Sequence, residues 1–352
     1  MTNKWVFLYG GQGSQQPGMG LDFALEFPDD SFYRSPYCSE EELTCLLDPS
    51  FTRIHETRYA QVALTLFALT VTRLLQKENI NPGAALGLSA GEFPALAAAN
   101  VYSPEEALEI IKRRARLMSL RLEKRRKEGH DDGMLVVLGL KREALEAVLP
   151  LFPAVSLANI NAETQLTAAG PKDDLELLRQ HLPEAGAKRA LLLEVEGAFH
   201  SKVFNPDVEE LRKVLLAAGS AGKPQAELPL NILGRPVTEP DDSKQQRDAD
   251  QPSDIYQQGD TDHPSDSENP YTPERRTEIY ADLMSRQMSS VTRLDDCFSY
   301  LLDHGYTNFV EIAPQAVLTP LLRRRSRDLN LRHISSVETF NNFVAEIKGS
   351  QR

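Results

Sequence analysis

Residues 87–91 read Gly-Leu-Ser-Ala-Gly, and their types and spacing point most directly to chemistry. The pattern G-x-S-x-G is typical of a nucleophile elbow, in which a serine lies on a sharp turn between a strand and a helix. Apolar residues 84–86 precede the turn and a helix-forming segment, 92–99, follows it. Such a turn exposes the Ser89 hydroxyl at a helix N-terminus, where backbone amides stabilise developing negative charge. An ordinary turn with a capping serine fits this short pattern equally well.

Two further segments contain residues that could contact a ligand. The glycine-rich turn 10–15 follows a strand-like segment, 5–9, and can bring backbone amides close to a bound group. It lacks the Lys-Ser/Thr ending of a phosphate loop, so a nucleotide site is not indicated. Gln61 lies in the first turn of an amphipathic helix predicted over 59–76, where its amide either contacts a substrate or caps a loop.

Composition limits the classes of function. The net charge of −12 over 352 residues argues against a general affinity for nucleic acid. Nine basic residues nevertheless lie between positions 112 and 127, and a second basic cluster covers 323–327; both could be solvated helix faces. The three cysteines lack the spacing of a zinc site or a disulfide framework, so we expect reduced thiols and no metal.

The N-terminus runs directly into a strand-like segment, and no apolar run approaches the roughly 20 residues of a membrane span. We therefore expect a cytoplasmic protein without a membrane segment. Residues 21–58 are interrupted by prolines and are interpreted as a lid or packing segment. A long helix is predicted from about Pro104 to Gly129.

A compact β-α-β-β-α-β alternation follows the long helix and predicts a ferredoxin-like unit over 131–195. Its predicted strands are 134–140, 155–159, 165–169 and 188–193, and its predicted helices are 142–149 and 172–182.

Residues 239–274 differ from the rest of the chain. They hold nine acids between Asp241 and Glu268, several prolines and almost no apolar side chains. Such a composition cannot bury enough apolar surface to fold, so we predict a disordered acidic insertion. The elements predicted around it are helices 204–217, 278–288, 294–304, 317–325 and 338–348, and strands 308–312 and 333–335.

The chain from Trp5 to about Phe343 resembles the malonyl-CoA:acyl carrier protein transacylases of fatty-acid synthesis and the acyltransferases of polyketide synthases. An ordered set of segments carries this resemblance. They are Gly-Gln-Gly-Ser-Gln at 11–15, Gln-Val-Ala-Leu at 61–64, Gly-Leu-Ser-Ala-Gly-Glu at 87–92, Arg-Ala-Arg-Leu-Met at 114–118, Gly-Ala-Phe-His-Ser at 197–201, Asn231, and Glu-Ile-Ala-Pro at 311–314.

The resemblance implies an α/β fold: an α/β-hydrolase-like catalytic domain with a parallel sheet, residues 1–130 and 196–352, and an inserted small subdomain, 131–195. It implies that Ser89 is the nucleophile and His200 its general base, a role suited to a side chain that titrates near neutrality. It also implies that a backbone carbonyl near Asn231 holds the histidine. A satisfied core histidine is the alternative at position 200.

The resemblance further implies an oxyanion hole formed by the backbone amides of Gln12 and Ala90. Arg114 would pair with the free carboxylate of a malonyl group, supported by Gln61. Phe199 would favour malonyl over methylmalonyl groups. Arg114 is otherwise one more member of a basic helix face.

The implied reaction moves a malonyl group from malonyl-CoA to the phosphopantetheine thiol of an acyl carrier protein, without a bound cofactor. The alternatives are an acyl hydrolase that uses the same residues, and a non-catalytic docking subunit. Because carrier proteins are typically acidic, Lys124, Arg125 and Arg126 are predicted to dock the carrier near the cleft, with 323–327 as a second contact. We expect a monomer.

Overall fold

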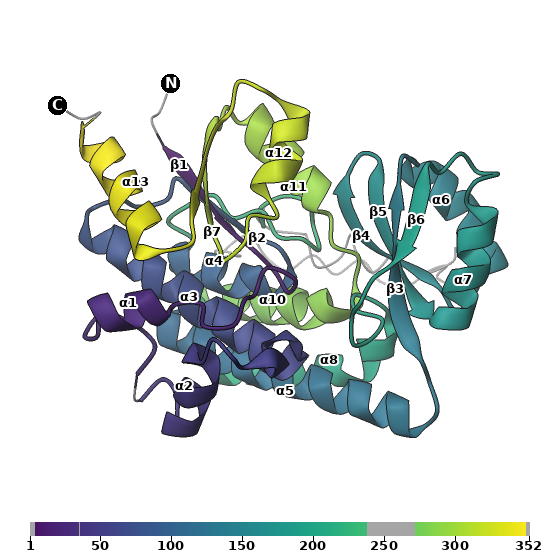
Figure 1. Cartoon of the computed structure of the whole chain (residues 1–352), viewed down its shortest axis with the longest axis horizontal. Helices are drawn as coiled ribbons and strands as arrows, with labels where there is room; N and C mark the ends of the chain where they lie inside the picture. Colours follow the sequence, from purple (N-terminus) through teal and green to yellow (C-terminus); the bar gives the residue numbers. More distant parts are fainter. Residues whose placement is uncertain (1–3, 35, 238–271, 350–352) are drawn as a thin grey trace, which may run out of the picture.

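Two four-stranded sheets, one parallel and one antiparallel, organise the structure (Figure 1). It is a computed structural model that describes residues 4–34, 36–237 and 272–349. The α/β class expected from the sequence is confirmed. In the described ranges, none of the helices combines the length and the apolar character that a membrane crossing needs.

The parallel sheet has the strand order β2-β1-β7-β8. Its strands are β1 Trp5–Tyr9, β2 Ala84–Gly87, β7 Asn308–Ile312 and β8 Asn330–Ile334. All strands run the same way, so the carboxyl ends of β1 and β2 lie side by side, with Tyr9 opposite Gly87. The glycine-rich turn and the elbow both leave from this edge, which is where open parallel sheets bind ligands.

Helices cover both faces of this sheet, and every residue of β1 is therefore buried. Val6 and Leu8 of β1 point to a core shared with α11 Leu294–Asp303 and α12 Thr319–Arg325. Phe7 points to the opposite core, which α3 Thr57–Lys77, α4 Glu92–Ala98 and α5 Pro104–Lys127 supply. A strand buried on both faces reads as a continuous apolar run, as residues 5–9 do.

Helix α5 connects the two sheets. Ser103 caps its N-terminus in a capping box with Glu106, and Pro104 occupies the first turn, where its missing N–H costs nothing. In Figure 1 the helix passes below the parallel sheet and leads into the antiparallel one. The long helix predicted from Pro104 therefore forms, and ends two residues earlier than expected.

The antiparallel sheet has the strand order β4-β5-β3-β6 and packs on α6 Arg142–Val148 and α7 Lys172–His181. Its strands are β3 Asp132–Leu138, β4 Ser156–Ala162, β5 Gln165–Pro171 and β6 Arg189–Leu192. The six elements follow one another along the chain in the order that the sequence predicted. Strand β6 lies at one edge of the sheet.

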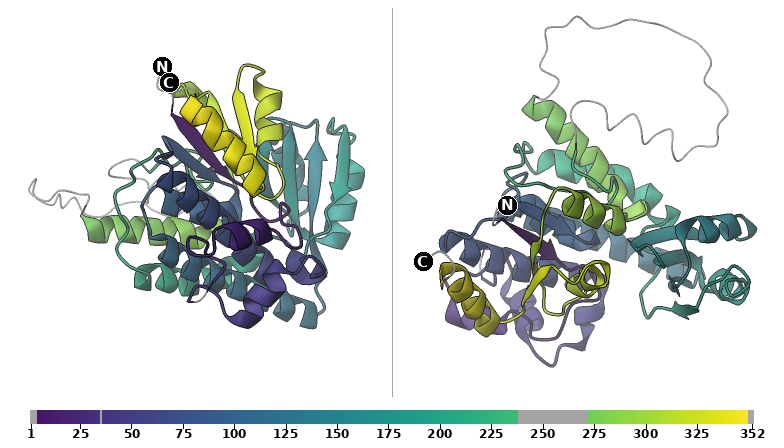
Figure 2. Two further views of the ribbon diagram at one scale, coloured as in Figure 1. Left: turned by 60° about the vertical axis from the view of Figure 1, so that its left-hand side comes forward. Right: turned by 90° about the horizontal axis from the view of Figure 1, so that it is seen from above.

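The remaining helices pack around the parallel sheet. Helix α1, Leu21–Glu26, lies beside the C-terminal helix α13, Val337–Gly349, where the rings of Phe23 and Phe340 stand 6.2 Å apart (Figure 2). Residues 21–58, interpreted as a lid or packing segment, thus contribute to the core, and they also contain α2 Glu40–Leu47. Helix α8 is Val208–Ala217.

The predicted acidic insertion 239–274 lies outside the described residues except for its last three positions. There the prediction is wrong: Thr272 caps helix α10, which runs over Pro273–Arg286. The helix begins five residues earlier than expected, because Thr-Pro-Glu is an N-terminal helix signal that the acidic composition obscured. All three cysteines are free thiols, as expected.

Candidate active site

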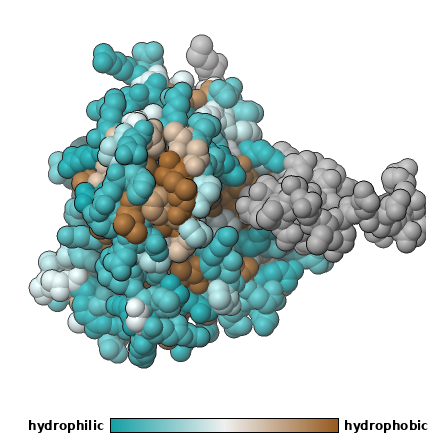
Figure 3. All heavy atoms as spheres, turned by 90° about the vertical axis from the view of Figure 1, so that its right-hand side faces the viewer, coloured by the Kyte–Doolittle hydropathy of each residue, from teal (hydrophilic) through white to brown (hydrophobic). Residues whose placement is uncertain are grey.

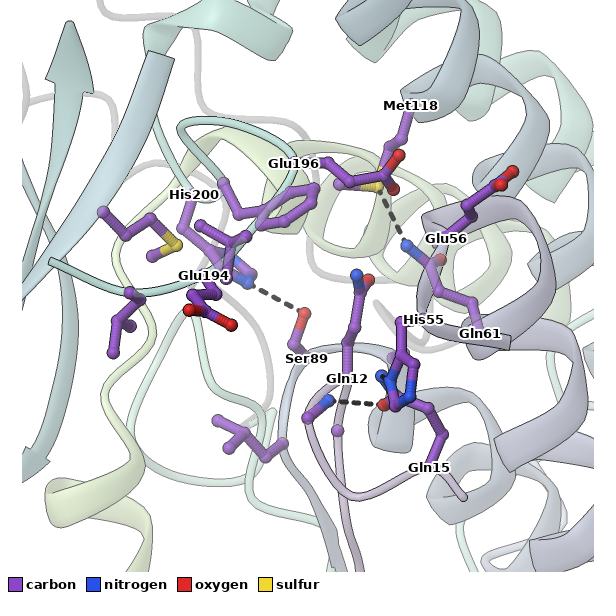
Figure 4. A pocket seen from close by; sticks show the side chains of 18 of the residues that line it. Gln12, Gln15, His55, Glu56, Gln61, Ser89, Met118, Glu194, Glu196 and His200 are labelled. Carbon is purple, nitrogen blue, oxygen red and sulfur yellow. Dashed lines mark hydrogen bonds between the residues drawn. The ribbon is translucent and has the colours of Figure 1, made fainter. Parts of the chain in front are cut away.

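A cavity of about 950 Å³ opens between the two sheets at the carboxyl edge of the parallel sheet. The glycine-rich turn, the elbow and residues 52–56 line one side, and residues of β3, β4, β5 and the segment 193–200 line the other. Figure 4 shows Ser89 and His200 pointing toward each other from opposite sides of this cavity. The parallel sheet and the antiparallel sheet therefore contribute different halves of one site.

The elbow forms because two glycines allow the chain to pass itself closely. A Cβ atom on Gly87 would lie 2.0 Å from the carbonyl carbon of Gly91, and one on Gly91 would lie 2.3 Å from the Tyr9 carbonyl oxygen. Between them Ser89 adopts a positive φ of 53°. Left-handed backbone at a non-glycine residue is costly, and such strain concentrates at functional sites.

Ser89 and His200 form a hydrogen bond across the cavity. The distance between Ser89 Oγ and His200 Nε2 is 2.8 Å. The other ring nitrogen, Nδ1, lies 3.0 Å from the Gln287 carbonyl oxygen, which can only accept a hydrogen bond. The proton of a neutral imidazole is therefore on Nδ1, and Nε2 is free to accept the serine proton.

The surroundings of His200 keep its ring uncharged. Burial, followed by the positive charge of Arg114, lowers its pKa from 6.5 to about 4. His200 also has a positive φ, 56°, so both hydrogen-bonded partners are held in strained backbone. The ring is ready to act as a base at neutral pH.

Arg114 is completely buried beneath this pair. Its guanidinium donates to Gln61 Oε1 at 2.6 Å, to Gln287 Oε1 at 2.8 Å and to Ser89 Oγ at 3.4 Å. Burial lowers the pKa of Arg114 to about 10, while the charge of Glu92 opposes the shift, so the guanidinium stays charged. Its neighbours Arg113 and Arg116 instead line a groove on the outside of α5. Arg114 is therefore not part of the exposed basic face of this helix.

The expectation for Asn231 is wrong. The carbonyl that holds His200 belongs to Gln287, whereas Asn231 secures the elbow: its Oδ1 accepts from the Ser89 amide at 2.9 Å and its Nδ2 donates to the Gly87 carbonyl at 2.8 Å. An amide side chain suits this position because it supplies a donor and an acceptor together.

Sequence reasoning missed two buried residues, Gln287 and Glu92. Gln287 lies in a short 3-10 turn directly after α10, and its side chain contacts both Ser89 and Arg114. Glu92 is the first residue of α4, and its position directly after the elbow glycine was the only available signal. Nothing in the local sequence marked Gln287.

The other predicted ligand contacts lie in the same cavity. Gln12, Ala90 and Phe199 line it, and the Phe199 ring stacks on Phe204 with centroids 6.0 Å apart. A Cβ atom on Gly11 would lie 2.5 Å from the Leu88 carbonyl oxygen, so the glycine-rich turn approaches the elbow closely.

The predicted docking residues have unequal surroundings. Arg125 forms a two-pronged ion pair with the buried Asp132 of β3, with distances of 2.7 and 2.9 Å, and is therefore a structural link. Lys124 is largely exposed, and Arg126 lies 4.0 Å from Glu196, which lines the cavity.

The second basic cluster, by contrast, lies away from the cavity. Arg323 and Arg327 line a groove with Asn330, at the amino end of β8. That end of the strand is opposite to the carboxyl edge from which the elbow leaves. A second carrier contact at 323–327 therefore does not adjoin the cavity. In the described part of the chain, no cluster of three or more His, Cys, Asp or Glu side chains could hold a metal ion.

The sequence matches known transacylases over most of its length. It is 27% identical to the malonyl CoA-acyl carrier protein transacylase of Bacillus subtilis, covering 98% of both chains. It is 28% identical to the polyketide biosynthesis malonyl CoA-acyl carrier protein transacylase PksC of the same organism, covering 92% of this chain and 97% of PksC. It is also 29% identical to the polyketide biosynthesis protein ThaF of Burkholderia thailandensis, but spans only 24% of that longer protein.

Solved structures of transacylases share the fold of this chain. The acyl carrier protein S-malonyltransferase of Vibrio cholerae superposes with a TM-score of 0.78 at 25% identity, covering 97% of this chain and all of that one. The transacylase in a type II polyketide synthase complex with its acyl carrier protein shares the fold, with a TM-score of 0.77 at 23% identity. The family model for the acyl transferase domain matches residues 6–342, so the chain belongs to the acyl transferase domain family.

Proposed function

We propose that this protein transfers a malonyl group from malonyl-CoA to the phosphopantetheine thiol of an acyl carrier protein, through an ester on Ser89. One observation carries the proposal: Ser89 Oγ lies 2.8 Å from a neutral imidazole nitrogen and 3.4 Å from a buried guanidinium. A base beside the hydroxyl activates it, and the cation suits an acyl group that carries its own carboxylate. The full-length relatives named as malonyl CoA-acyl carrier protein transacylases support the same substrates.

The first half-reaction forms the acyl-enzyme. His200 Nε2 takes the proton of Ser89 as Oγ attacks the thioester carbonyl carbon. The backbone amides of Gln12 and Ala90, which line the cavity, would stabilise the negative oxygen of the tetrahedral intermediate. The carbon–sulfur bond then breaks, and the CoA thiolate takes the proton from His200 and leaves as the thiol.

The second half-reaction reverses these roles. The carrier thiol gives its proton to His200 and its sulfur attacks the ester carbonyl. The bond to Ser89 Oγ breaks, His200 returns the proton to the serine, and the malonyl thioester leaves on the carrier. The Gln287 carbonyl keeps the ring in one tautomer throughout, in place of the acidic third member of a triad.

Arg114 would bind the malonyl carboxylate. Gln61 and Gln287 orient its guanidinium with two neutral oxygens, so the charge stays available to an anion. Phe199, on the cavity wall, would occupy the space that an α-methyl group needs, which favours malonyl over methylmalonyl groups. Exclusion of one methyl group is worth about 1–3 kcal/mol, so the selectivity would be partial.

The partner would be the carrier protein or carrier domain of a fatty-acid or polyketide synthase. Both relatives from Bacillus subtilis are named for an acyl carrier protein, and PksC is also named for polyketide biosynthesis. Lys124 and Arg126 remain the proposed docking residues.

We also propose a cytoplasmic monomer that needs no bound cofactor. We divide it into a hydrolase-like catalytic domain, 1–130 and 196–352, and a ferredoxin-like subdomain, 131–195. Transfer to water by an acyl hydrolase uses the same Ser89 and His200 but has no need of the buried Arg114.

The proposal is tested by intact-protein mass spectrometry after separate incubation with malonyl-CoA, acetyl-CoA and methylmalonyl-CoA. We expect the malonyl mass to appear first and to be discharged by a phosphopantetheinylated carrier protein. Ser89→Ala should gain no acyl mass and keep its circular dichroism spectrum. Labelling of the alanine variant would refute the nucleophile, and equally fast discharge without the carrier would favour the hydrolase.

A further inference from the structure

Glu92 is a buried carboxylate at the active site that no step of the proposed reaction uses. Only 1% of its surface is exposed, although it directly follows the elbow. Its Oε1 accepts from the Asn231 backbone amide at 2.7 Å, and its Oε2 accepts from Gln287 Nε2 at 2.6 Å. Two short hydrogen bonds to an acidic side chain in the interior suggest a specific purpose, because burying a carboxylate is costly.

The bond to Gln287 determines which way the Gln287 amide faces. Burial raises the pKa of the Glu92 carboxyl to about 7, against the hydrogen bonds from Asn231 and Gln287, so the group is ionised above neutral pH. An ionised carboxylate only accepts hydrogen bonds, so in that state the NH₂ end must point to Glu92. The same NH₂ group donates to the Ser89 carbonyl oxygen at 2.8 Å. The oxygen end is thereby left for Arg114, which donates to it at 2.8 Å.

The reverse orientation would damage the site. With the amide in the reverse orientation, two donors, the Gln287 NH₂ and the Arg114 guanidinium, would face each other in the buried interior. Arg114 would lose one of its two amide-oxygen acceptors, which would favour a different position of its guanidinium. The charge of Glu92 also supports the cationic state of Arg114, whose pKa its burial lowers.

We propose that Glu92 is a positioning residue that orients the Gln287 amide and, through it, holds Arg114 where it recognises the carboxylate of the acyl group. The inference rests on the proposed malonyl transfer, which it deepens. Glu92 does not contact the substrate; it acts through Gln287. Its removal should therefore affect acyl groups that carry a carboxylate more than those that do not.

The test is Glu92→Gln, which keeps the shape and removes the charge. The Asn231 amide would hold the oxygen of a glutamine at this position, so its NH₂ group would face Gln287 and favour the reverse orientation of the Gln287 amide. We expect kcat/KM for malonyl-CoA to fall about tenfold or more, the effect of weakening one charged hydrogen bond, with a much smaller fall for acetyl-CoA. In an Arg114→Ala background the same change should leave the malonyl-to-acetyl ratio unaltered, because the two residues act through one interaction.

Glu311→Gln is the matched control. Glu311 is also fully buried, and its carboxylate accepts from the backbone amides of Val317, Leu318 and Thr319 at the start of α12. This variant should lower the melting temperature and leave the malonyl-to-acetyl ratio unchanged. Glu92→Asp, which keeps the charge, should retain more selectivity than Glu92→Gln.

If Glu92→Gln does not fold, Gln287→Met replaces it, since this variant removes the amide but keeps the backbone carbonyl that holds His200. It should show the same loss of the malonyl-to-acetyl ratio. An unchanged ratio in a folded variant, or an equal change in Glu311→Gln, would overturn the positioning role. Failure of the unsubstituted protein to accept a malonyl group would instead overturn the proposed function.

Discussion

His200 differs from an ordinary histidine because both of its ring nitrogens form hydrogen bonds and its ring is buried. One nitrogen donates to a carbonyl and the other accepts from Ser89, while Arg114 disfavours a second positive charge nearby. The imidazole therefore stays neutral well below its usual titration range. In the proposed reaction this arrangement would supply a base without an acidic partner.

The lowered pKa has a consequence for pH dependence. The neutral base is present above a pKa of about 4, so kcat/KM for acylation by malonyl-CoA should stay level from neutrality through pH 6.5 and fall as pH approaches 4. The measurement is the initial rate of Ser89 acylation at low malonyl-CoA concentration over this range. A midpoint at the ordinary value of 6.5 would contradict the buried, neutral ring.

Arg114 should determine which acyl group is accepted. Arg114→Ala removes the buried cation that donates to Gln61 and Ser89, two residues of the cavity wall, so kcat/KM for malonyl-CoA should fall about 10- to 100-fold, the range for a lost charged hydrogen bond. Transfer from acetyl-CoA should fall much less, because its acyl group has no carboxylate. Equal losses for both substrates would indicate structural damage to the cavity. Arg116→Ala, on the outer face of the same helix, is the matched control and should change neither rate.

At the scale of elements, the elbow depends on two glycines that no alanine can replace. Gly87→Ala would place a methyl group 2.0 Å from the Gly91 carbonyl carbon, and backbone cannot yield as a flexible side chain can. We expect a loss of about 1–3 kcal/mol or more of folding free energy, by analogy with overpacked cores, together with loss of acylation. Urea unfolding monitored by circular dichroism measures the first, and mass spectrometry the second.

Gly349→Ala serves as the comparison for this substitution. Gly349 ends α13, and nothing lies within 4 Å of the position its Cβ atom would take. This variant should unfold at the same urea concentration as the unsubstituted protein. Normal acylation by Gly87→Ala would show that the turn is more adaptable than its geometry indicates.

Helix α5 carries both the proposed substrate-binding residue Arg114 and a structural contact to the antiparallel sheet. It carries Arg114 into the core, and at its other end the Arg125 guanidinium binds Asp132 at the start of β3. Arg125 therefore cannot be exchanged freely to test docking, because its loss would leave a buried carboxylate without its partner. The basic segment contains a substrate-binding candidate, a structural ion pair and exposed charges within one helix.

At the scale of the whole molecule, the proposed docking brings a typically acidic carrier protein to a chain of net charge −12, so it needs basic side chains at the contact. Reversing Lys124 and Arg126 to glutamate, with Arg125 left in place, should raise KM for the carrier protein and flatten its salt dependence. Acylation by malonyl-CoA alone should hardly change. Carrier-protein kinetics at several ionic strengths make the measurement.

The control for docking is a pair of arginines at the opposite edge of the parallel sheet. Reversing Arg323 and Arg327 changes the net charge by the same amount, at a groove beside the amino end of β8. If docking depends on charge close to the cavity, this pair should have little effect. Equal effects of the two pairs would point to the overall charge of the protein.

Figure 3 shows the face of the molecule on the side of the antiparallel sheet, with an apolar area between polar side chains. Apart from this view, the edge strand β6 has two exposed leucines, Leu191 at 39% and Leu192 at 42% exposure. The sequence predicts a strand over 188–193 but not its place in the sheet. Its exposure depends on the strand order, which places β6 at the edge of its sheet.

The sequence by itself determined the local elements and the site's most recognisable residues. Apolar runs fixed the buried strands, capping residues fixed the start of α5, and the glycine spacing marked the turn around Ser89, because each depends on neighbouring residues. Local sequence does not determine whether Ser89 contacts His200, since 111 positions separate them.

Only the tertiary structure decided which carbonyl holds the histidine. Gln287 lies 87 positions after His200, and no local pattern marks a residue that contributes its backbone oxygen. The same holds for Asn231, whose amide reaches back across 142 positions to the Ser89 amide. Hydrogen bonds between segments so far apart follow from how the two sheets and α10 pack, and that packing depends on the whole chain at once.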